Sequence, residues 1–233
     1  QPAKMIIASS SSRDKSVTLP VLTNSSLTVK SAEVVITEGS QLTEIDATGS
    51  DINQSSNLHV TGNFTMNRGS YEQTGELTVD GTFSITNDAE FTQNNKLTLA
   101  GNGDLTVNDW VWINNYPAQQ WNNILVSSGG WIKSGLETSL EITAVNLSID
   151  SSSGIDVSGR GYQKHPEITG MAGASHGGSG GYDEGESINQ TYGNYKEPVT
   201  MGYAGGSSEE YRGGGAVKLT PSGKLTNNGG IYA

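Results

Sequence analysis

Short alternating apolar triplets recur along the first hundred residues, and this repeat constrains the fold more than any other feature. Two neighbouring units, which begin at Leu58 and Leu77, align over their whole length. Each has an apolar triplet, a glycine, a Phe-x-Met or Phe-x-Ile segment, an asparagine turn and a second short strand. Such a unit cannot bury its apolar side alone, so several must stack. The leucines that open these triplets are Leu27, Leu42, Leu58, Leu77 and Leu97, spaced by 15, 16, 19 and 20 residues.

Side chains alternate across a strand, so each unit directs its apolar residues to one side. In the unit from Leu77, we expect Val79, Phe83 and Ile85 to point inward with it. The repeat predicts an all-β fold, a right-handed parallel β-helix (β-solenoid) with a long glycine-rich loop insertion. An antiparallel sandwich is the alternative, but it requires hairpin turns such as Asn-Gly between paired strands, and the sequence contains few of them.

Two segments interrupt the repeat. Residues 108–135 hold all four tryptophans, and residues 159–215 are rich in glycine. Apolar triplets resume between and after these segments, so we expect residues 1–233 to form one solenoid domain. No signal peptide is recognisable at the start and the sequence stops within a coil, so we expect a fragment of a longer chain.

Composition excludes several functional classes. The net charge of −11 argues against nucleic acid, because proteins bind phosphates through Lys and Arg. No apolar run approaches the ~20 residues that span a bilayer, so we expect no membrane insertion. The chain has no cysteine, which excludes disulfides and thiolate metal sites and favours a bacterial exterior. We therefore expect a secreted, extracellular protein at the cell surface.

Four motifs in the last third of the chain occur in a recognisable order. They are IDSSSGIDVSGRGY at 149–162, GASHGGSGG at 173–181, YGNYKEP at 192–198 and GGGAVKL at 213–219. In combination they resemble a glycine-rich parallel β-helix segment of large bacterial secreted or surface proteins, often adhesin-like. The resemblance implies a solenoid fold and a surface location. Residues 201–210 depart from it, because they are longer and more acidic than the usual glycine–serine run.

An aromatic cluster in the first interruption is a candidate binding surface. Trp110, Trp112, Tyr116 and Trp121 lie within twelve residues of one another, and the first two share one strand face. These rings either form a platform for sugar faces or pack over the interruption of the solenoid. His176, Tyr192 and Tyr195 of the glycine-rich insertion complete the candidate ligand-binding set.

The insertion also holds candidate metal ligands. Asp183, Glu184 and Glu186 could supply oxygen ligands to calcium, which prefers several carboxylate and carbonyl oxygens. Their spacing matches no EF-hand or nonapeptide calcium motif, so a solvated acidic loop is the alternative. We expect His176 to bond nearby backbone and fix the loop. The cofactor prediction is therefore none, with calcium as the one candidate.

These observations favour a structural or adhesive module that presents a rigid solenoid to glycan or protein partners. A carbohydrate-active enzyme is one alternative, and it requires two or more charged residues converging in one groove. The outward positions are mostly Thr, Ser and Asn, and no catalytic motif is recognisable, so we expect no enzyme. A self-assembling filament is the other alternative, because solenoid ends expose unpaired strand edges.

Overall fold

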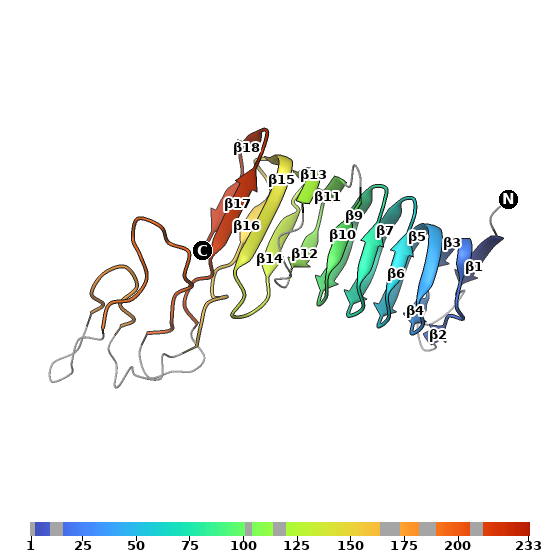
Figure 1. Ribbon diagram of the computed structural model, residues 1–233, viewed down its shortest axis with the longest axis horizontal. Coiled ribbons are helices and arrows are strands. Elements are labelled where there is room, and N and C mark those ends of the chain that lie inside the picture. Colours follow the sequence, from blue (N-terminus) through green and yellow to red (C-terminus); the bar gives the residue numbers. More distant parts are fainter. Residues whose placement is uncertain are drawn as a thin grey trace.

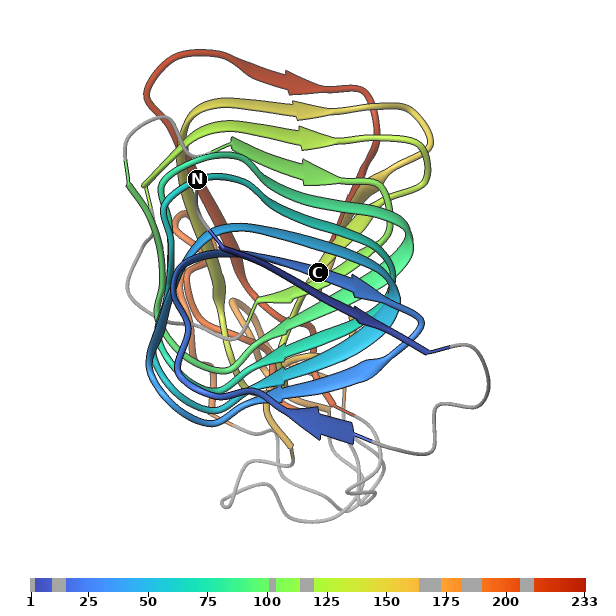
Figure 2. The ribbon, with the colours of Figure 1, turned by 90° about the vertical axis from the view of Figure 1, so that its right-hand side faces the viewer.

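The chain coils into a right-handed parallel β-solenoid. The computed structural model describes residues 3–9, 16–100, 104–113, 120–163, 173–181, 190–205 and 212–233. Within these ranges all the secondary structure is β, and the strands pair in parallel in one continuous sheet. Coils stack along the long axis (Figure 1). Viewed from the N-terminal end, the chain turns clockwise as it recedes (Figure 2). The predicted all-β, right-handed solenoid is confirmed.

The strand pairings define three faces. Face 1 consists of β1 (Ala3–Ala8), β3 (Thr23–Lys30), the middle of β5 (Ser40–Gln54), the first halves of β7 (Phe64–Gln73) and β9 (Phe83–Gln93), β11 (Asp104–Val107), β13 (Gln120–Val126), the end of β15 (Leu140–Ile149) and β18 (Leu225–Asn227). Face 2 consists of β2 (Ser16–Thr18), β4 (Glu33–Ile36), the ends of β5, β7 and β9, then β12 (Trp110–Ile113), β14 (Trp131–Ser134), β16 (Gly154–Asp156) and β19 (Gly230–Tyr232). Face 3 consists of the start of β5, β6 (Leu58–Val60), β8 (Leu77–Val79), β10 (Leu97–Leu99), the start of β15 and β17 (Val217–Pro221).

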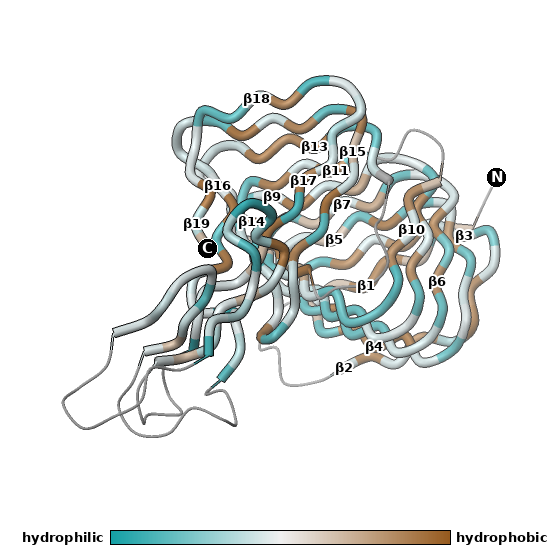
Figure 3. Tube along the Cα trace, turned by 60° about the vertical axis from the view of Figure 1, so that its left-hand side comes forward, coloured by the Kyte–Doolittle hydropathy of each residue, from teal (hydrophilic) through white to brown (hydrophobic). Residues whose placement is uncertain are grey.

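A continuous apolar core runs along the axis. Leu77, Val79, Phe83 and Ile85 are fully buried, as their inward assignment predicts. Hydrophobic and hydrophilic residues alternate along the strands (Figure 3). Like side chains stack between coils, and the rings of Phe64 and Phe83 have centroids 5.0 Å apart.

The leucines that open the triplets do not form one column. Leu27 lies on face 1 and pairs with Ile45, whereas Leu58, Leu77 and Leu97 form a column on face 3. The spacings of 15 and 16 residues thus compare positions on different faces. True partners on face 1 lie further apart, as in the pairs Leu27–Ile45 and Ile45–Phe64, which are separated by 18 and 19 residues.

A row of buried glutamine side chains borders the apolar core along face 2. Gln54, Gln73 and Gln93 are buried in successive coils. The Nε2 atom of Gln73 donates to the carbonyl oxygens of Gly75 and Lys96, at 2.9 and 2.8 Å. Such side-chain amides satisfy turn carbonyls that would otherwise be buried without a partner.

The glycine-rich stretch leaves the solenoid after β16 and returns at β17. The described parts of this stretch project beside the last coils (Figure 1). Faces 1 and 2 nevertheless continue beyond this stretch. On face 1 Leu147 pairs with Leu225, and on face 2 Ile155 pairs with Ile231. Leu225 and Ile231 occupy inward positions yet are exposed on the last coil. Self-association through such an edge stays a prediction.

Candidate functional site

Aromatic side chains gather on the outer side of face 2 in the C-terminal half. Val111 of β12 is buried, so Trp110 and Trp112 on either side of it point outward. The Trp110 ring stacks on Trp131 of β14, with centroids 6.4 Å apart and planes 22° apart. Trp131 in turn stacks on Tyr232 of β19, at 5.8 Å and 21°. Such spacings are typical of favourable offset-stacked rings.

Two cations lie against the tryptophans. The Lys133 ammonium is 4.1 Å from the ring centroid of Trp110 and 5.4 Å from that of Trp112. The Arg160 guanidinium is 4.5 Å from the Trp112 ring. These distances fit cation–π interactions, in which the negative ring face attracts the cation. The aromatic–cation patch is defined as Trp110, Trp112, Trp131, Lys133, Arg160 and Tyr232.

Two glycines make the ring column fit. In the strand register, Trp110, Trp131, Gly154 and Gly230 occupy equivalent positions in successive coils. A Cβ on Gly154 would come within 2.5 Å of the Trp131 indole, and one on Gly230 within 2.6 Å of the Tyr232 ring. The missing side chains therefore leave the space in which Trp131 reaches past β16 to Tyr232. β14, β16 and β19 lie side by side near the C-terminus (Figure 3).

The patch is partly open to solvent. Trp110 is 37% exposed and Tyr232 is 54% exposed, whereas Trp112 and Trp131 are half-buried. Aromatic rings that remain accessible on a polar chain commonly mark a surface for a partner. Their strand positions hold them in place before any partner arrives.

One carboxylate borders the patch. Asp156 Oδ2 lies 3.7 Å from the Lys133 ammonium. Partial burial raises the pKa of Asp156, but hydrogen bonds from Ser158 and the charge of Lys133 outweigh it, so the net pKa is lowered. Asp156 is therefore ionised at neutral pH.

The predicted aromatic cluster is only partly one surface. Trp110 and Trp112 share a strand face as expected. Trp121 does not join them, because it is 3% exposed and pairs with Ala144 in the core. Tyr116 lies outside the described residues. The structure adds Trp131, whose coil position is equivalent to that of Trp110, and Tyr232, which only the register of the last coil brings to Trp131.

A second aromatic cluster organises the glycine-rich stretch. Tyr162 and Tyr203 stack at 4.7 Å, and the ring of Tyr192 meets Tyr203 edge-on at 5.1 Å. His176 Nε2 lies 3.0 Å from the carbonyl oxygen of Thr200 and 2.9 Å from its hydroxyl. These bonds agree with the expectation that His176 fixes the loop to nearby backbone.

The remaining predicted ligand-binding residues of this stretch are separate from the patch. Burial raises the pKa of Tyr192, although the backbone N–H of Tyr203 donates a hydrogen bond to its hydroxyl at 2.6 Å and partly offsets this. Tyr195 is 74% exposed, with the Lys196 ammonium 5.7 Å from its ring. A ligand-binding role for His176, Tyr192 and Tyr195 stays a prediction.

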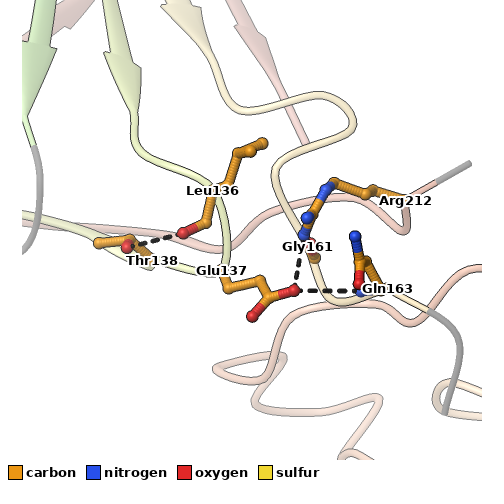
Figure 4. Close-up of polar contacts among 6 residues, drawn as sticks. All are labelled: Leu136, Glu137, Thr138, Gly161, Gln163 and Arg212. Atoms are coloured by element: carbon orange, nitrogen blue, oxygen red, sulfur yellow. Dashed lines mark hydrogen bonds and ion pairs between the residues drawn. The ribbon is translucent and has the colours of Figure 1, made fainter. Parts of the chain in front are cut away.

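An ion pair fastens both ends of the insertion to the preceding coil (Figure 4). Arg212 donates to Glu137 Oε1 at 2.6 Å and to the carbonyl oxygen of Gly161 at 3.3 Å. The Gln163 N–H also donates to Glu137 Oε1, at 3.5 Å. The hydrogen bond from Arg212, followed by that from Gln163, lowers the pKa of Glu137.

A groove lies between the start of face 3 in the last coils and the glycine-rich stretch. It has a volume of about 540 Å³, and Glu141, Glu197, Lys218, Pro198 and Val199 contribute to its lining. The Lys218 ammonium lies 3.9 Å from a carboxylate oxygen of Glu141. Two carboxylates therefore line one groove.

The predicted calcium ligands Asp183, Glu184 and Glu186 lie outside the described residues. Among the residues that are described, no group of three or more His, Asp or Glu could hold a metal ion. Calcium binding stays a prediction. The described part of the chain also has no helix long and apolar enough to cross a membrane.

The fold places the chain in the class of parallel β-solenoid proteins. Comparison with known proteins found no matching protein family, no similar curated protein and no similar solved structure.

Proposed function

We propose that the protein is a structural and adhesive module of the cell exterior, a rigid solenoid that binds a glycan through the aromatic–cation patch. The observation that carries the proposal is the column of Trp110, Trp131 and Tyr232 on the outside of face 2. The C–H faces of sugar rings are apolar, so they leave water when they pack against aromatic rings.

The solenoid suits such a surface because it fixes the rings in advance. Each ring of the column is attached to a paired strand, so little conformational freedom remains to be lost on binding. Stacked strands repeat about every 4.8 Å along the axis, so an extended chain lying along the axis meets the rings in turn. This favours a polymer over a compact small molecule.

The exterior location is the part of the proposal that depends on composition. The chain has a net charge of −11 and no cysteine. A high net charge keeps an elongated molecule soluble. Secreted eukaryotic domains often carry disulfides, so the lack of cysteine favours a bacterial exterior. A protein partner at the same patch is the competing form of adhesion.

Retention on immobilised cellulose, chitin, polygalacturonate, alginate and dextran sulfate tests the proposal. We expect retention on at least one, and Trp110→Ala or Tyr232→Ala to weaken it at least about tenfold, as truncation of a central aromatic contact does. Leu125→Ala is the matched control, because it removes an exposed apolar side chain on face 1, away from the patch. Failure of the whole panel, or equal loss in the Leu125 variant, would refute glycan binding by the patch.

A carbohydrate-active enzyme is the second candidate, and the groove at face 3 favours it. Glu141 and Glu197 both line this groove, and paired carboxylates are what glycosidic acid–base chemistry requires. Incubation with the same polysaccharides should then release new reducing ends, and Glu141→Gln or Glu197→Gln should abolish the release. If no polysaccharide that the chain binds releases new reducing ends, the enzyme candidate is excluded and the adhesive function remains.

A further inference from the structure

We propose that the glycan bound by the patch is an acidic polysaccharide, whose carboxylate or sulfate groups bind Arg160 and Lys133. This inference rests on the proposed glycan binding and names the class of glycan. It starts from Arg160, whose guanidinium lies over the Trp112 ring. Within the described part of the chain, that guanidinium has neither an ion pair nor a hydrogen bond. Its N–H donors are therefore available to an anion.

Lys133 is the second cation of the site. Its side chain is only 17% exposed, because it lies between the Trp110 and Trp112 rings. Its contact with Asp156 is 3.7 Å long, beyond the range of a short charge-assisted hydrogen bond. The patch thus contains two positive charges, in a chain whose net charge is −11.

The position of the cations favours an anionic over a neutral sugar. A cation on a ring face occupies the place that a sugar would take on that face. Trp110 and Trp112 therefore each lose one stacking face to Lys133 or Arg160. An anionic group can bind these cations directly, and hydrogen bonds between charged partners are about twice as strong as neutral ones. The planar fork of arginine also matches carboxylate and sulfate oxygens.

The rings and cations lie along one path. Trp110 and Trp131 belong to adjacent coils, and Tyr232 lies two coils beyond Trp131, with β16 in between. Lys133 is in β14, and Arg160 follows the next strand of face 2, β16. A polymer lying along face 2 can therefore contact the solvent-exposed parts of Trp110 and Tyr232 and place its acidic groups at the cations.

Matched pairs of polysaccharides test the inference. The full chain is applied to polygalacturonate and to its methyl ester, and to dextran sulfate and to dextran, in the presence of a chelator. The chelator removes calcium, which could otherwise bridge an acidic polysaccharide to an acidic protein. The chain's own negative charge opposes nonspecific binding to polyanions, so retention reports the local patch.

We expect retention on polygalacturonate, dextran sulfate or both, and at least about tenfold weaker retention on the uncharged member of the same pair. Added salt should weaken the retention, because it screens exposed charges. Arg160→Gln and Lys133→Gln should each reduce it about tenfold, whereas Lys30→Gln should not, since Lys30 is an exposed residue of β3 on face 1. If the replacement of Lys133 changes the packing of Trp110 and Trp112, the Arg160→Gln variant decides the test.

Two outcomes would overturn the inference, and they differ in meaning. Equal retention on the charged and uncharged members of a pair would refute acidic-group recognition but leave glycan binding by the rings. Equal weakening by Lys30→Gln and Arg160→Gln would show that only net charge matters. Absence of retention on every polysaccharide, including cellulose and chitin, would instead refute the proposed function itself.

Discussion

Replacement of Gly154 by alanine should displace the last coil and break the ring column. The new Cβ would lie 2.5 Å from a ring carbon of Trp131 and 2.5 Å from the carbonyl oxygen of Gly230. The indole can turn away at modest cost, because it is the end of a flexible side chain. The Gly230 carbonyl belongs to β19 backbone, so β19 must shift as a unit. Tyr232, which lies on that strand, should then separate from Trp131.

The expected destabilisation follows from these two contacts. Inserting one extra carbon into a closely packed site costs about 1–3 kcal/mol. For a chain of this length, each kcal/mol lowers Tm by about 2–4 °C, so the loss is about 2–12 °C. Unfolding in a solenoid begins in its weakest coil, so the loss should appear as earlier melting of the C-terminal coil.

Near-ultraviolet circular dichroism and thermal melting measure the two effects. The Gly154→Ala variant should lose part of the tryptophan signal at temperatures where the strands remain folded. Gly178→Ala is the matched control, because a Cβ there would meet no atom within 4 Å. If the Gly154 variant kept both the native spectrum and a Tm within about 1 °C of the parent, the reasoning from close packing would be wrong.

Three further predictions concern polar contacts. Tyr71→Phe removes a buried hydroxyl that donates to Gln54 Oε1 at 2.6 Å, so the free energy of unfolding measured in urea should fall by about 1–3 kcal/mol. An unchanged urea midpoint would contradict this prediction. Hydrogen bonds from the Ser153 side chain and the Ser128 N–H, with others, lower the pKa of Asp150 from 3.8 to about 2. The ionised Asp150 therefore stabilises the fold fully above pH 3.8, and this stabilisation is lost as the pH falls towards 2. Asp150→Asn should reduce this dependence of Tm on acid pH. Glu137→Gln weakens the bond to Arg212, so proteases should cut residues 157–216 faster, while the Tm of the coils stays the same. Equal cleavage rates in the variant and the parent would exclude a fastening role for Glu137.

The repeat in the sequence was sufficient to predict the architecture. Alternating apolar residues such as those around Leu77 and Phe83 are buried when equivalent coils stack on one another. Their complete burial confirms it. The same pattern could not assign columns to faces. Leu27 and Leu42 look alike in sequence, but Leu27 pairs with Ile45, because the path of the coil determines which positions meet.

The candidate site was only half visible in the sequence. The alternation in Trp110-Val-Trp112 placed two rings on one outward face, since neighbouring side chains of a strand point to opposite sides. Local sequence does not distinguish Trp121, which is buried in the core, from the two outward tryptophans. The cations over the rings were also missed, because Lys133 and Arg160 reach the tryptophans from later coils.

The alternating apolar repeat predicted a parallel solenoid in preference to an antiparallel sandwich, because stacked coils bury the apolar side of every unit and the sequence has few hairpin turns. Which residues meet on one surface depended on the tertiary structure. Tyr232 meets Trp131 across a separation of 101 residues, because the last coil closes over the insertion and Gly154 leaves space between the rings. Such a contact depends on the register of coils joined through a long loop, and no local pattern encodes that register.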